Sequence, residues 1–502
     1  MSRVLEAIAL HARQRPEAIA LEALDAQLGY AALHAAIEAL AQALSARGFR
    51  TLGLLADNGL AWALADLAAI RAGLRLVPLP PFFSAAQVAH ALRNAGVEAL
   101  LIDPRLVQGP LAALPAESLN LGGGAGTLTL LRLPPAATPE LPAGTCKITY
   151  TSGTTGEPKG VCLGLAEMER VAAALAQASG AREDDRHLGV LPLSTLLENL
   201  GGLYAPLLAG ATACLWPMAE VGLRGAAGLQ PRLLLEALDV ARASSAILVP
   251  QLLQAIVEAI EAGLPRPARL RFVAVGGAPL APKLLQRAQR LGLPVFEGYG
   301  LSECASVIAL STPDAQRAGS VGRPLPHLRL SFADDGEILV AGNGFRGYIG
   351  EAPRDPQAPV ATGDLGHLDA DGYLWLTGRK KNMFVTAFGR NVAPEWVERE
   401  LCLQPAIAQA AVFGEARPWN VAVIQPRAQA AGDPEAVAAA IDAVNAELPD
   451  YARIRRWLFA AAPFSPDNGQ LTPNGRLRRA AILAQYGAAI DSLYEEKIHE
   501  LL

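Results

Sequence analysis

The chain has 502 residues, with 43 Lys and Arg against 48 Asp and Glu, so its formal net charge is −5. A nucleic-acid-binding surface needs clustered basic charge, and this balance argues against one. The length exceeds what one ordinary core holds, which predicts at least two domains. The five cysteines include no C-x-x-C pair and the seven histidines no metal-ligand spacing. We therefore expect reduced thiols, no zinc site and a cytoplasmic location.

Two segments bear on membrane targeting. The N-terminal residues alternate charged and apolar side chains and lack the apolar core of a secretory signal. Residues 200–219 carry no charge and are about as long as a bilayer span, but they contain Pro206 and Pro217. We predict instead a helix ending at Gly210 and a buried strand over 211–216, and no transmembrane segment.

The first 145 residues begin an alternating pattern. A helix is predicted over 30–48, and strands over 50–56, 74–79 and 97–103. Residues 108–145 are rich in Gly, Pro, Ala and Leu, and we predict a surface connection there.

From 145 to 300 short β-rich runs alternate with amphipathic helices, which predicts parallel sheet with helices on both faces. Ligands of such sheets bind beyond the carboxyl ends of the strands, so the glycines at 153–156, 276–277 and 298–300 are expected to meet on one rim. Strands are predicted over 147–151, 160–164, 187–193, 245–250, 270–277 and 294–300, and helices over 166–178, 231–243, 250–263 and 281–292.

After residue 320 the pattern changes to short strands with turns, including "DDG" and "ADG" hairpin signals. Beyond 380 a small α+β unit follows, with strands over 408–414 and 420–426, helices over 394–402 and 434–448, and a last helix from Leu477. The predicted fold is α/β. A large N-terminal domain, residues 1–380, has doubly wound, mostly parallel sheets and a β-rich subdomain, and a small α+β domain, residues 381–502, follows it.

The stretch "TSGTTGEPKG", residues 151–160, predicts an anion-binding loop. It is not a Walker A loop, because Gly160 rather than Ser or Thr follows Lys159. Glycines let successive backbone N–H groups face an anion, hydroxyls add donors, and a lysine adds a point charge. A polar surface loop is the alternative, but it does not explain Lys159 in a chain with only six lysines.

"YTSGTTGEPKG" resembles the phosphate-loop signature of the adenylate-forming superfamily, which includes acyl- and aryl-CoA synthetases, adenylation domains of peptide synthetases and firefly-type luciferases. Further motifs resemble those of the family in the same order: "VGGAPL" (275–280), "EGYGLSE" (297–303), "ATGDLG" (361–366), "GRKKNMFVTAFGRNVAPEWVE" (378–398) and "LTPNGRLRR" (471–479). The combination is most similar to bacterial medium- and long-chain fatty-acid–CoA ligases. The resemblance spans nearly the whole chain.

The resemblance implies a reaction in two halves. A carboxylate attacks the α-phosphorus of ATP, giving an acyl-adenylate and pyrophosphate, and the thiol of CoA then displaces AMP. Mg²⁺ would be held by Glu303. The implied catalytic residues are Lys159, Ser302, Glu303 and Arg476. The implied nucleotide-binding residues are Thr151, Ser152, Gly153, Thr154, Thr155, Gly156, Lys159, Gly276, Gly277, Ala278, Glu297, Gly298, Tyr299, Ser302, Asp364 and Arg379.

The same resemblance makes Lys381 the hinge about which a mobile C-terminal domain rotates between the half-reactions. The thiol side would be formed by Phe388, Gly389, Arg390 and Asn391, and the acyl pocket by Thr195, Asn199, Val249, Gly276 and Gly300. A tryptophan at the position of Gly300 blocks the pocket in acetate-specific relatives, so glycine there predicts an acid longer than acetate or propionate.

Two positions depart from the family pattern. Arg476 stands where the family usually has a lysine, and Thr195 where many relatives have histidine or an aromatic residue. Arginine keeps the charge but differs in geometry. Several alternatives therefore stay open: an acyl-AMP ligase loading an acyl carrier protein, an aryl-CoA ligase, or a non-catalytic nucleotide-binding relative. The chain is expected to be a monomer or a homodimer.

Overall fold

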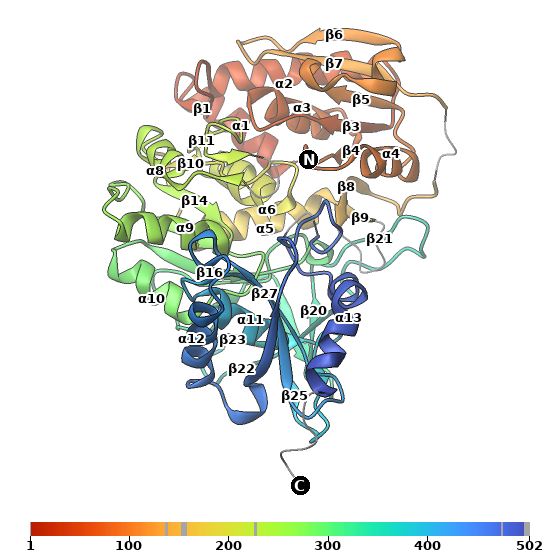
Figure 1. Ribbon diagram of the computed structural model, residues 1–502. Coiled ribbons are helices and arrows are strands. Elements are labelled where there is room, and N and C mark those ends of the chain that lie inside the picture. Colours follow the sequence, from red (N-terminus) through yellow and green to blue (C-terminus); the bar gives the residue numbers. More distant parts are fainter. Residues whose placement is uncertain (1, 136–138, 152–157, 225–227, 473–474, 496–502) are drawn as a thin grey trace. The chain divides into compact units, whose positions relative to one another are not determined.

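The computed structural model describes residues 2–135, 139–151, 158–224, 228–472 and 475–495 (Figure 1). The chain forms two compact units. The first comprises Met1–Gly277, Arg287–Ser331 and Leu339–Val360; the second comprises Ala278–Gln286, Phe332–Ile338 and Ala361–Leu502. The mixed α/β class predicted from the sequence is confirmed, and the domain boundary between 380 and 381 stays a prediction.

Among the described residues, one large sheet of the first unit has nine strands in the order β18-β17-β16-β15-β14-β10-β11-β1-β2. The strands from β16 to β1 run parallel, and β2, β17 and β18 run antiparallel at the edges. The bounds are β1 (Ile19–Glu22), β2 (Gln27–Gly29), β10 (Arg186–Leu188), β11 (Thr212–Cys214), β14 (Ser245–Leu248), β15 (Phe272–Val275), β16 (Val295–Tyr299), β17 (Ala309–Leu310) and β18 (Arg323–Pro324).

The other large sheet of this unit has eight described strands in the order β21-β9-β8-β4-β3-β5-β7-β6. Its central strands β8, β4, β3 and β5 are parallel, and the four outer ones are antiparallel. The bounds are β3 (Thr51–Leu55), β4 (Arg75–Pro78), β5 (Ala99–Ile102), β6 (Ala116–Asn120), β7 (Thr127–Arg132), β8 (Thr145–Thr151), β9 (Lys159–Gly164) and β21 (Gly347–Tyr348). A two-stranded ribbon of β12 (Leu223–Arg224) and β13 (Gly228–Leu229) is separate.

The helices of the first unit bury their apolar faces against these sheets, as their spacing predicts. Helix α3 (Leu60–Arg71) is buried almost all round and packs against α2, β3 and β4. The other helices are α1 (Arg3–Gln14), α2 (Tyr30–Ser45), α4 (Ala85–Asn94), α5 (Leu165–Ala178), α6 (Leu196–Glu198), α7 (Ala205–Ala209), α8 (Pro231–Val240) and α9 (Pro250–Glu261), with 3₁₀ turns η1 (Pro104–Leu106), η2 (Gly109–Ala113) and η4 (Ser302–Cys304) and the π-helix η3 (Asn199–Tyr204). Helix α10 (Pro282–Arg290) follows β15 in the chain.

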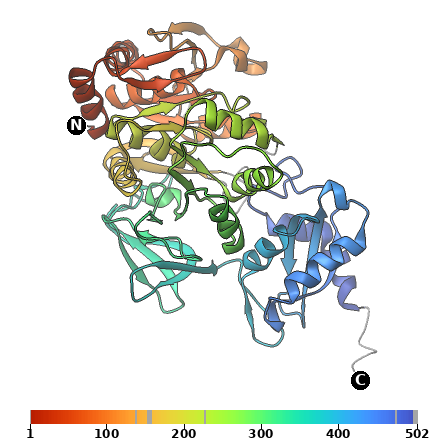
Figure 2. The same ribbon diagram turned by 90° about the vertical axis from the view of Figure 1, so that its left-hand side faces the viewer.

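The predicted surface connection over 108–145 is wrong. Strands β6 and β7 pair as an antiparallel hairpin at the edge of the eight-stranded sheet, and Figures 1 and 2 show this hairpin in orange. In β7, Leu128, Leu130 and Leu131 are buried. Leucines that were counted as part of a loop-like composition are therefore core residues. The glycines cluster in the turn between the two strands, where Gly122, Gly123, Gly124 and Gly126 all have positive φ.

Two further expectations need correction. Residues 160–164 form β9, but β9 runs antiparallel to β8 because the connection between them is far shorter than a parallel crossover requires. Residues 187–193 contain only the short strand β10, which ends at Leu188. The segments after β15 and β16 do lie side by side, as predicted, but β8 belongs to the other sheet. The glycines at 153–156 lie outside the described residues, so their meeting with the other two clusters stays a prediction.

Helix ends follow local signals. The predicted stop at Gly210 is confirmed, because this glycine caps α7 with a left-handed φ of 75°. The π-helix η3 lies directly before α7, within the segment predicted as one helix.

Another sheet has four described strands, in the order β19-β20-β22-β23. Its strands are β19 (Arg329–Phe332), β20 (Glu337–Ala341), β22 (Val360–Leu368) and β23 (Leu374–Arg379), which confirms the two predicted hairpin regions. The second unit continues with a hairpin of β24 (Phe384–Val385) and β25 (Asn391–Val392) and a three-stranded sheet β26-β27-β28, with bounds Ile407–Phe413, Asn420–Pro426 and Ile454–Phe459. Its helices are α11 (Pro394–Cys402), α12 (Pro434–Asn445) and α13 (Arg479–Glu495), with 3₁₀ turns η5 (Ala428–Ala430) and η6 (Asp450–Ala452).

The three-stranded sheet carries an apolar cluster on each face. One contains Val397 of α11 and Ile441 of α12, and the other contains Ile482 and Tyr486 of α13. Arg479 anchors α13: its guanidinium donates to both carboxylate oxygens of the buried Glu398, at 2.7 and 2.6 Å, and to the Val412 carbonyl at 2.9 Å. This ion pair joins α11, β26 and α13.

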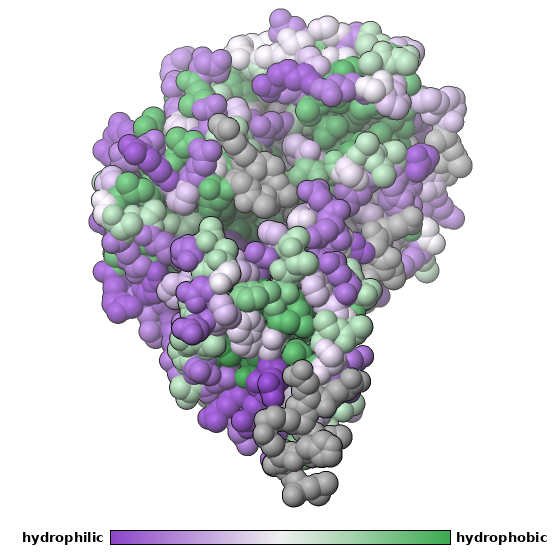
Figure 3. All heavy atoms as spheres, viewed as in Figure 1, coloured by the Kyte–Doolittle hydropathy of each residue, from purple (hydrophilic) through white to green (hydrophobic). Residues whose placement is uncertain are grey.

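Within the described part of the chain, no helix is both long and apolar enough to cross a membrane. On the face shown in Figure 3, hydrophilic and hydrophobic residues are interspersed in small areas. The five cysteines are free thiols, and Cys162, Cys214 and Cys304 are buried.

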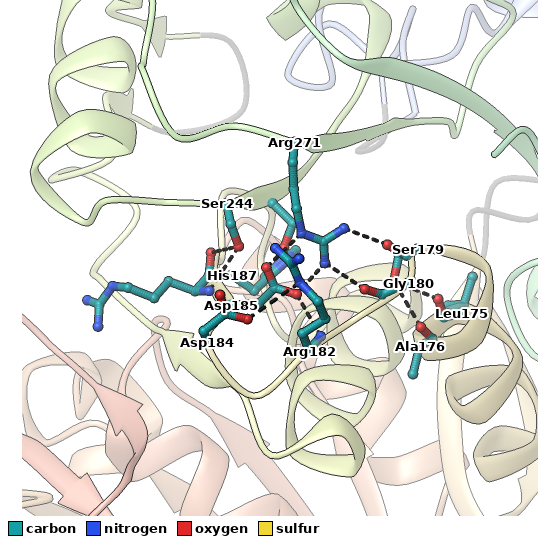
Figure 4. A network of polar contacts seen from close by, with 12 residues as sticks. Leu175, Ala176, Ser179, Gly180, Arg182, Asp184, Asp185, His187, Ser244 and Arg271 are labelled. Carbon is teal, nitrogen blue, oxygen red and sulfur yellow. Dashed lines mark hydrogen bonds and ion pairs between the residues drawn. The ribbon is translucent and has the colours of Figure 1, made fainter. Parts of the chain in front are cut away.

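One guanidinium holds together the starts of β15 and β10, the two strands on either side of β14 (Figure 4). Arg271, just before β15, donates from Nε to Oδ1 of Asp185, just before β10, at 2.7 Å. The same group donates to the carbonyl oxygens of Ser179 and Gly180, at 2.7 and 3.0 Å, and so fixes the end of α5. These contacts lie at the strand ends opposite to those followed by the predicted site loops.

Candidate active site

The β8–β9 hairpin places two predicted residues opposite each other. Thr151, the last residue of β8, pairs in register with Lys159, the first residue of β9. The Lys159 ammonium is exposed, lies 3.4 Å from Oε1 of Glu351 and sits 4.9 Å from the centre of the Tyr348 ring. The predicted residues Ser152, Gly153, Thr154, Thr155 and Gly156 lie outside the described residues.

Glu303 is brought to the same place by Tyr348. Strand β21 pairs with β9, so that Tyr348 lies opposite Val161. The Tyr348 hydroxyl donates to Oε1 of Glu303 at 2.8 Å, and the backbone N–H of Phe345 donates to the Glu303 carbonyl at 2.7 Å. Burial, reinforced by Glu303, raises the pKa of Tyr348, so its hydroxyl keeps its proton and remains a donor. Lys159 and Glu303 thus share one neighbour, Tyr348, which is not among the residues predicted from the sequence motifs.

The loop that carries Glu303 has an unusual backbone. Ser302 and Glu303 lie in the 3₁₀ turn η4, and Ala305 and Ser306 after it have φ values of 56° and 92°. Positive φ in non-glycine residues costs energy and tends to occur at functional sites. The loop folds back so closely that a Cβ added at Gly300 would overlap the carbonyl oxygen of Ser306. The glycine at 300 is therefore required by the backbone, and it does not by itself indicate an open acyl tunnel.

The ends of β14, β15 and β16 bring other predicted residues together. Gly276 directly follows β15, and a Cβ added there would lie 3.1 Å from the Gly298 carbonyl of β16. A Cβ at Gly277, which has a φ of 83°, would lie 3.6 Å from Cγ1 of Val249. Tyr299 is half-buried at the end of β16. This part of the predicted nucleotide and acyl site is contiguous. Glu297, also on β16, is buried.

The segment 191–204 holds the two remaining predicted acyl-pocket residues. Thr195 is half-buried before α6, and its hydroxyl donates to the Pro192 carbonyl at 2.7 Å. Asn199 is 1% exposed, and its amide is bonded to Lys147 and Asp66.

In the second unit, Asp364 and Arg379 face each other across the β22–β23 pair. Arg379 Nε donates to Oδ1 of Asp364 at 2.8 Å, and the Asp364 backbone N–H donates to the Thr362 hydroxyl at 3.1 Å. An ordered carboxylate beside a guanidinium is a suitable acceptor and donor pair for the hydroxyls of a sugar. Ala278 also lies in this unit.

Lys381 follows two residues after Arg379 and is exposed. Partial burial of its amine, then the charges of Arg379 and Arg476, lower its pKa. Arg476 itself is exposed and lies in a turn, where its N–H donates to the Thr472 hydroxyl at 3.0 Å.

The predicted thiol-side residues form the turn of the β24–β25 hairpin. Gly389 has a φ of 71°, and the N–H groups of Gly389 and Arg390 both donate to Thr386. Phe388 is 75% exposed, an uncommon exposure for so large an apolar side chain. Asn391 begins β25 and is exposed.

Sequence reasoning missed a buried ion pair as well as Tyr348. Lys147 and Asp66 are 1% and 0% exposed, and a signal for both was present. Asp66 interrupts the apolar run "LAWALADLAAI", and Lys147 is the one charged residue of strand β8. A lone charge in each of two largely buried elements predicts that the two charges pair.

The donor set at Glu303 is suited to Mg²⁺. Among the described residues, no group of three or more metal-binding side chains occurs. A single carboxylate fits Mg²⁺, which is usually bound by one or two carboxylates together with substrate phosphates and water. Tyr348 fixes the orientation of that carboxylate, and Lys159 supplies positive charge nearby.

Comparison with known families and proteins agrees with this geometry. A family model described as AMP-binding enzyme matches residues 8–349, and one described as AMP-binding enzyme C-terminal domain matches residues 381–498. The long-chain-fatty-acid–CoA ligase FadD15 of Mycobacterium bovis is 30% identical over 87% of this chain and 86% of its own. The indoleacetate–CoA ligase of Aromatoleum aromaticum is 31% identical over 83% of this chain and 86% of its own.

Solved structures with similar folds cover nearly the whole chain. The o-succinylbenzoate CoA synthetase MenE of Bacillus subtilis, in complex with its acyl-adenylate intermediate, has a TM-score of 0.75 and 25% identity over 96% of this chain and 98% of its own. The anthranilate CoA ligase AuaEII has a TM-score of 0.80 over 97% of this chain and 98% of its own, and its 20% identity supports the fold alone.

Proposed function

The chain belongs to the family of AMP-binding enzymes and is an adenylate-forming acid–thiol ligase, and from this premise we propose that it converts a hydrophobic carboxylic acid into its CoA thioester. ATP activates the acid as an acyl-adenylate, pyrophosphate leaves, and CoA then displaces AMP. The first substrate candidate is a medium- or long-chain fatty acid. The observation that carries the proposal is the grouping of Lys159 and Glu303 around Tyr348 at the end of the β8–β9 hairpin.

This grouping suits the first half-reaction. A carboxylate is an anion that must approach a triphosphate, so catalysis depends mainly on positioning and charge neutralisation. Lys159 would neutralise phosphate oxygens, and Glu303 would hold Mg²⁺, which supplies further positive charge to the phosphates. Arg476 would contact the acid and the α-phosphate, with Ser302 as an added hydroxyl.

The nucleoside end would be bound by the remaining predicted residues. Tyr299 would pack on adenine, and Asp364 would accept hydrogen bonds from the ribose hydroxyls, with Arg379 beside it. The backbone ordering of Asp364 by Thr362 supports this role. We also propose that Lys381 is the hinge and that the turn around Phe388 approaches the thiol, which would give its exposed ring a partner in the second half-reaction.

An aromatic acid is the second candidate. Two observations favour it: relatives of similar identity include an indoleacetate–CoA ligase, and Gly300 is required by the adjoining backbone rather than by an open tunnel. An acyl carrier protein in place of CoA remains an alternative acceptor.

The test measures pyrophosphate release with acetate, octanoate, palmitate, benzoate and indoleacetate, each with and without CoA. Octanoate or palmitate should support release, acetate should not, and mass spectrometry should find the acyl-CoA. Preference for benzoate or indoleacetate would make the enzyme an aryl-CoA ligase. If the acyl product formed on a carrier protein but not on CoA, the acceptor would be the carrier protein.

A further inference from the structure

The segment from Leu191 to Tyr204, which carries Thr195, has buried polar contacts to one strand of each large sheet. Two consecutive residues make these contacts. Glu198 bonds to the nine-stranded sheet and Asn199 to the eight-stranded sheet. Both are almost completely inaccessible to solvent, at 0% and 1%.

The contact to the eight-stranded sheet is a four-residue cluster. Lys147 Nζ, on β8, donates to Oδ1 of Asp66 on α3 at 2.6 Å, to the Tyr204 hydroxyl at 3.0 Å and to Oδ1 of Asn199. The Asp66 carboxylate accepts further bonds from the Tyr204 hydroxyl, at 2.5 Å, and from the Asn199 amide, at 3.3 Å. Burial raises the pKa of Tyr204, which keeps this hydroxyl a donor.

The contact to the nine-stranded sheet joins Glu198 to β10. Oε1 of Glu198 lies 3.0 Å from Nε2 of His187, whose Nδ1 lies 3.0 Å from the Ser245 hydroxyl of β14. Oε2 of Glu198 accepts from the backbone N–H of Leu191 at 3.1 Å. A Cβ at Gly202 would overlap the Glu198 carboxylate, so the glycine makes room for this contact.

Such clusters need an explanation other than stability. Burying charged groups costs several kcal/mol per ion, and replacing a buried pair with apolar residues is often neutral or stabilising. Buried polar clusters are retained in some proteins because they fix one arrangement of the chain. The arrangement fixed here includes a π-helix, a form of helix that is frequent at functional sites.

We infer that Lys147 and Glu198 are positioning residues that hold the 191–204 segment in register with both sheets and so pre-form the acid-binding side of the active site. This inference rests on the proposed function and deepens it. Lys147 is not placed to touch the substrate, because it is 1% exposed and its three N–H groups all have acceptors. Lys147 therefore acts through Asn199, whose backbone N–H donates to the Thr195 carbonyl at 3.0 Å.

The experiment separates positioning from stability with a pair of variants. Lys147→Met removes the contact to Asn199 and leaves the Asp66 carboxylate buried without its cation, so it is expected to lower the melting temperature. Adding Asp66→Asn removes the unpaired charge while an amide at 66 can still bond Asn199 and Tyr204. The double variant Lys147→Met/Asp66→Asn should therefore recover most of the melting temperature without recovering the Lys147–Asn199 contact.

In the double variant we expect the KM for the acid to rise about tenfold, which is the effect of losing roughly one buried charged hydrogen bond. The KM for ATP should change less than about twofold. Arg271→Met is the control. This variant also removes the cation beside a buried carboxylate of the first unit, that of Asp185, but Arg271 does not contact the 191–204 segment. It should lower the melting temperature and leave the KM for the acid unchanged.

A readout independent of activity covers the case in which the proposed function is wrong. Amide hydrogen exchange over 191–204 should be faster in Lys147→Met/Asp66→Asn than in the native chain, and unchanged in Arg271→Met. If the native chain releases no pyrophosphate with any acid, the proposed function fails while the exchange result still decides whether the cluster fixes the segment. If the double variant recovers both melting temperature and acid KM, or exchange over 191–204 is unchanged, the inference is overturned.

Discussion

The hydroxyl of Tyr348 donates a 2.8 Å hydrogen bond to Oε1 of Glu303, and the ring of Tyr348 lies 4.9 Å from the ammonium of Lys159. One side chain thus contacts both a predicted Mg²⁺ ligand and a predicted phosphate ligand. These two residues are 144 positions apart in the chain, from 159 to 303, and β21 brings Tyr348 beside both through its pairing with β9.

Replacing Tyr348 with phenylalanine should slow adenylation while leaving the fold intact. The variant keeps the ring beside Lys159 and removes only the hydrogen bond that orients Glu303. We expect the kcat for pyrophosphate release to fall about tenfold, or about 1.4 kcal/mol, and the Mg²⁺ concentration for half-maximal rate to rise. Tyr30→Phe is the matched control, because its hydroxyl bonds the Ala211 carbonyl at 2.8 Å. Equal rates and equal Mg²⁺ dependence in Tyr348→Phe and the native enzyme would remove Tyr348 from the site.

Arg476 should be needed for its charge rather than for its guanidinium geometry. Arg476→Ala is expected to lower the rate of pyrophosphate release about 100-fold, the cost typical of losing one charged contact to the developing transition state. Arg476→Lys should stay within about tenfold of the native rate, because it keeps the charge. The measurement is the single-turnover rate of acyl-adenylate formation. Undiminished adenylation in Arg476→Ala would show that arginine has no catalytic role at this position.

His327 should make the first unit less stable in acid. Burial, and then the charge of Arg170, lower its pKa from 6.5 to about 4. The unfolded chain therefore takes up a proton on this histidine near pH 6.5, whereas the folded chain does so only near pH 4. The free energy of unfolding must fall as the pH decreases through this window. Between pH 6.5 and 4, the melting temperature of the native chain should thus fall more steeply than that of His327→Gln.

The same pH series is measured for His34→Gln, which removes a histidine from helix α2, as a second histidine variant. Parallel curves for the native chain and His327→Gln would contradict the assignment to His327.

The Arg479–Glu398 pair should be a major contribution to the stability of the second unit. Arg479→Met leaves the Glu398 carboxylate, which is 8% exposed, buried without its cation. The expected loss is about 3–5 kcal/mol in the free energy of unfolding, measured with urea. Adding Glu398→Gln removes the unpaired charge and should recover much of this loss. A loss below about 1 kcal/mol in Arg479→Met would instead place the pair among weak surface ion pairs.

Much of the fold was predictable because local signals and tertiary structure agree. The prolines that begin α8 and α9 and the glycine after α7 each specify an element that the structure contains. The β6–β7 hairpin was missed because its leucines resemble those of a helix or a loop. The pairing of β7 with β5 is a contact between different segments of the chain, which composition does not predict.

The candidate site was predictable where a motif is continuous in sequence and not where it depends on packing. Lys159, Glu303 and Asp364 follow from motifs, whereas Tyr348 enters only because β21 adds to the edge of β9. At Gly300, by contrast, a prediction from a continuous motif failed. Its sequence position suggested an open pocket, but the backbone of Ser306 fills the space where a side chain would lie.

The most direct test of the account is acid-dependent exchange of labelled pyrophosphate into ATP, measured without CoA. The account predicts exchange that depends on a hydrophobic acid such as octanoate or palmitate, is absent with acetate, and is strongly reduced in Arg476→Ala. Binding of ATP, confirmed separately by calorimetry, with no exchange for any acid in the panel would contradict it and would leave a nucleotide-binding protein without adenylating activity.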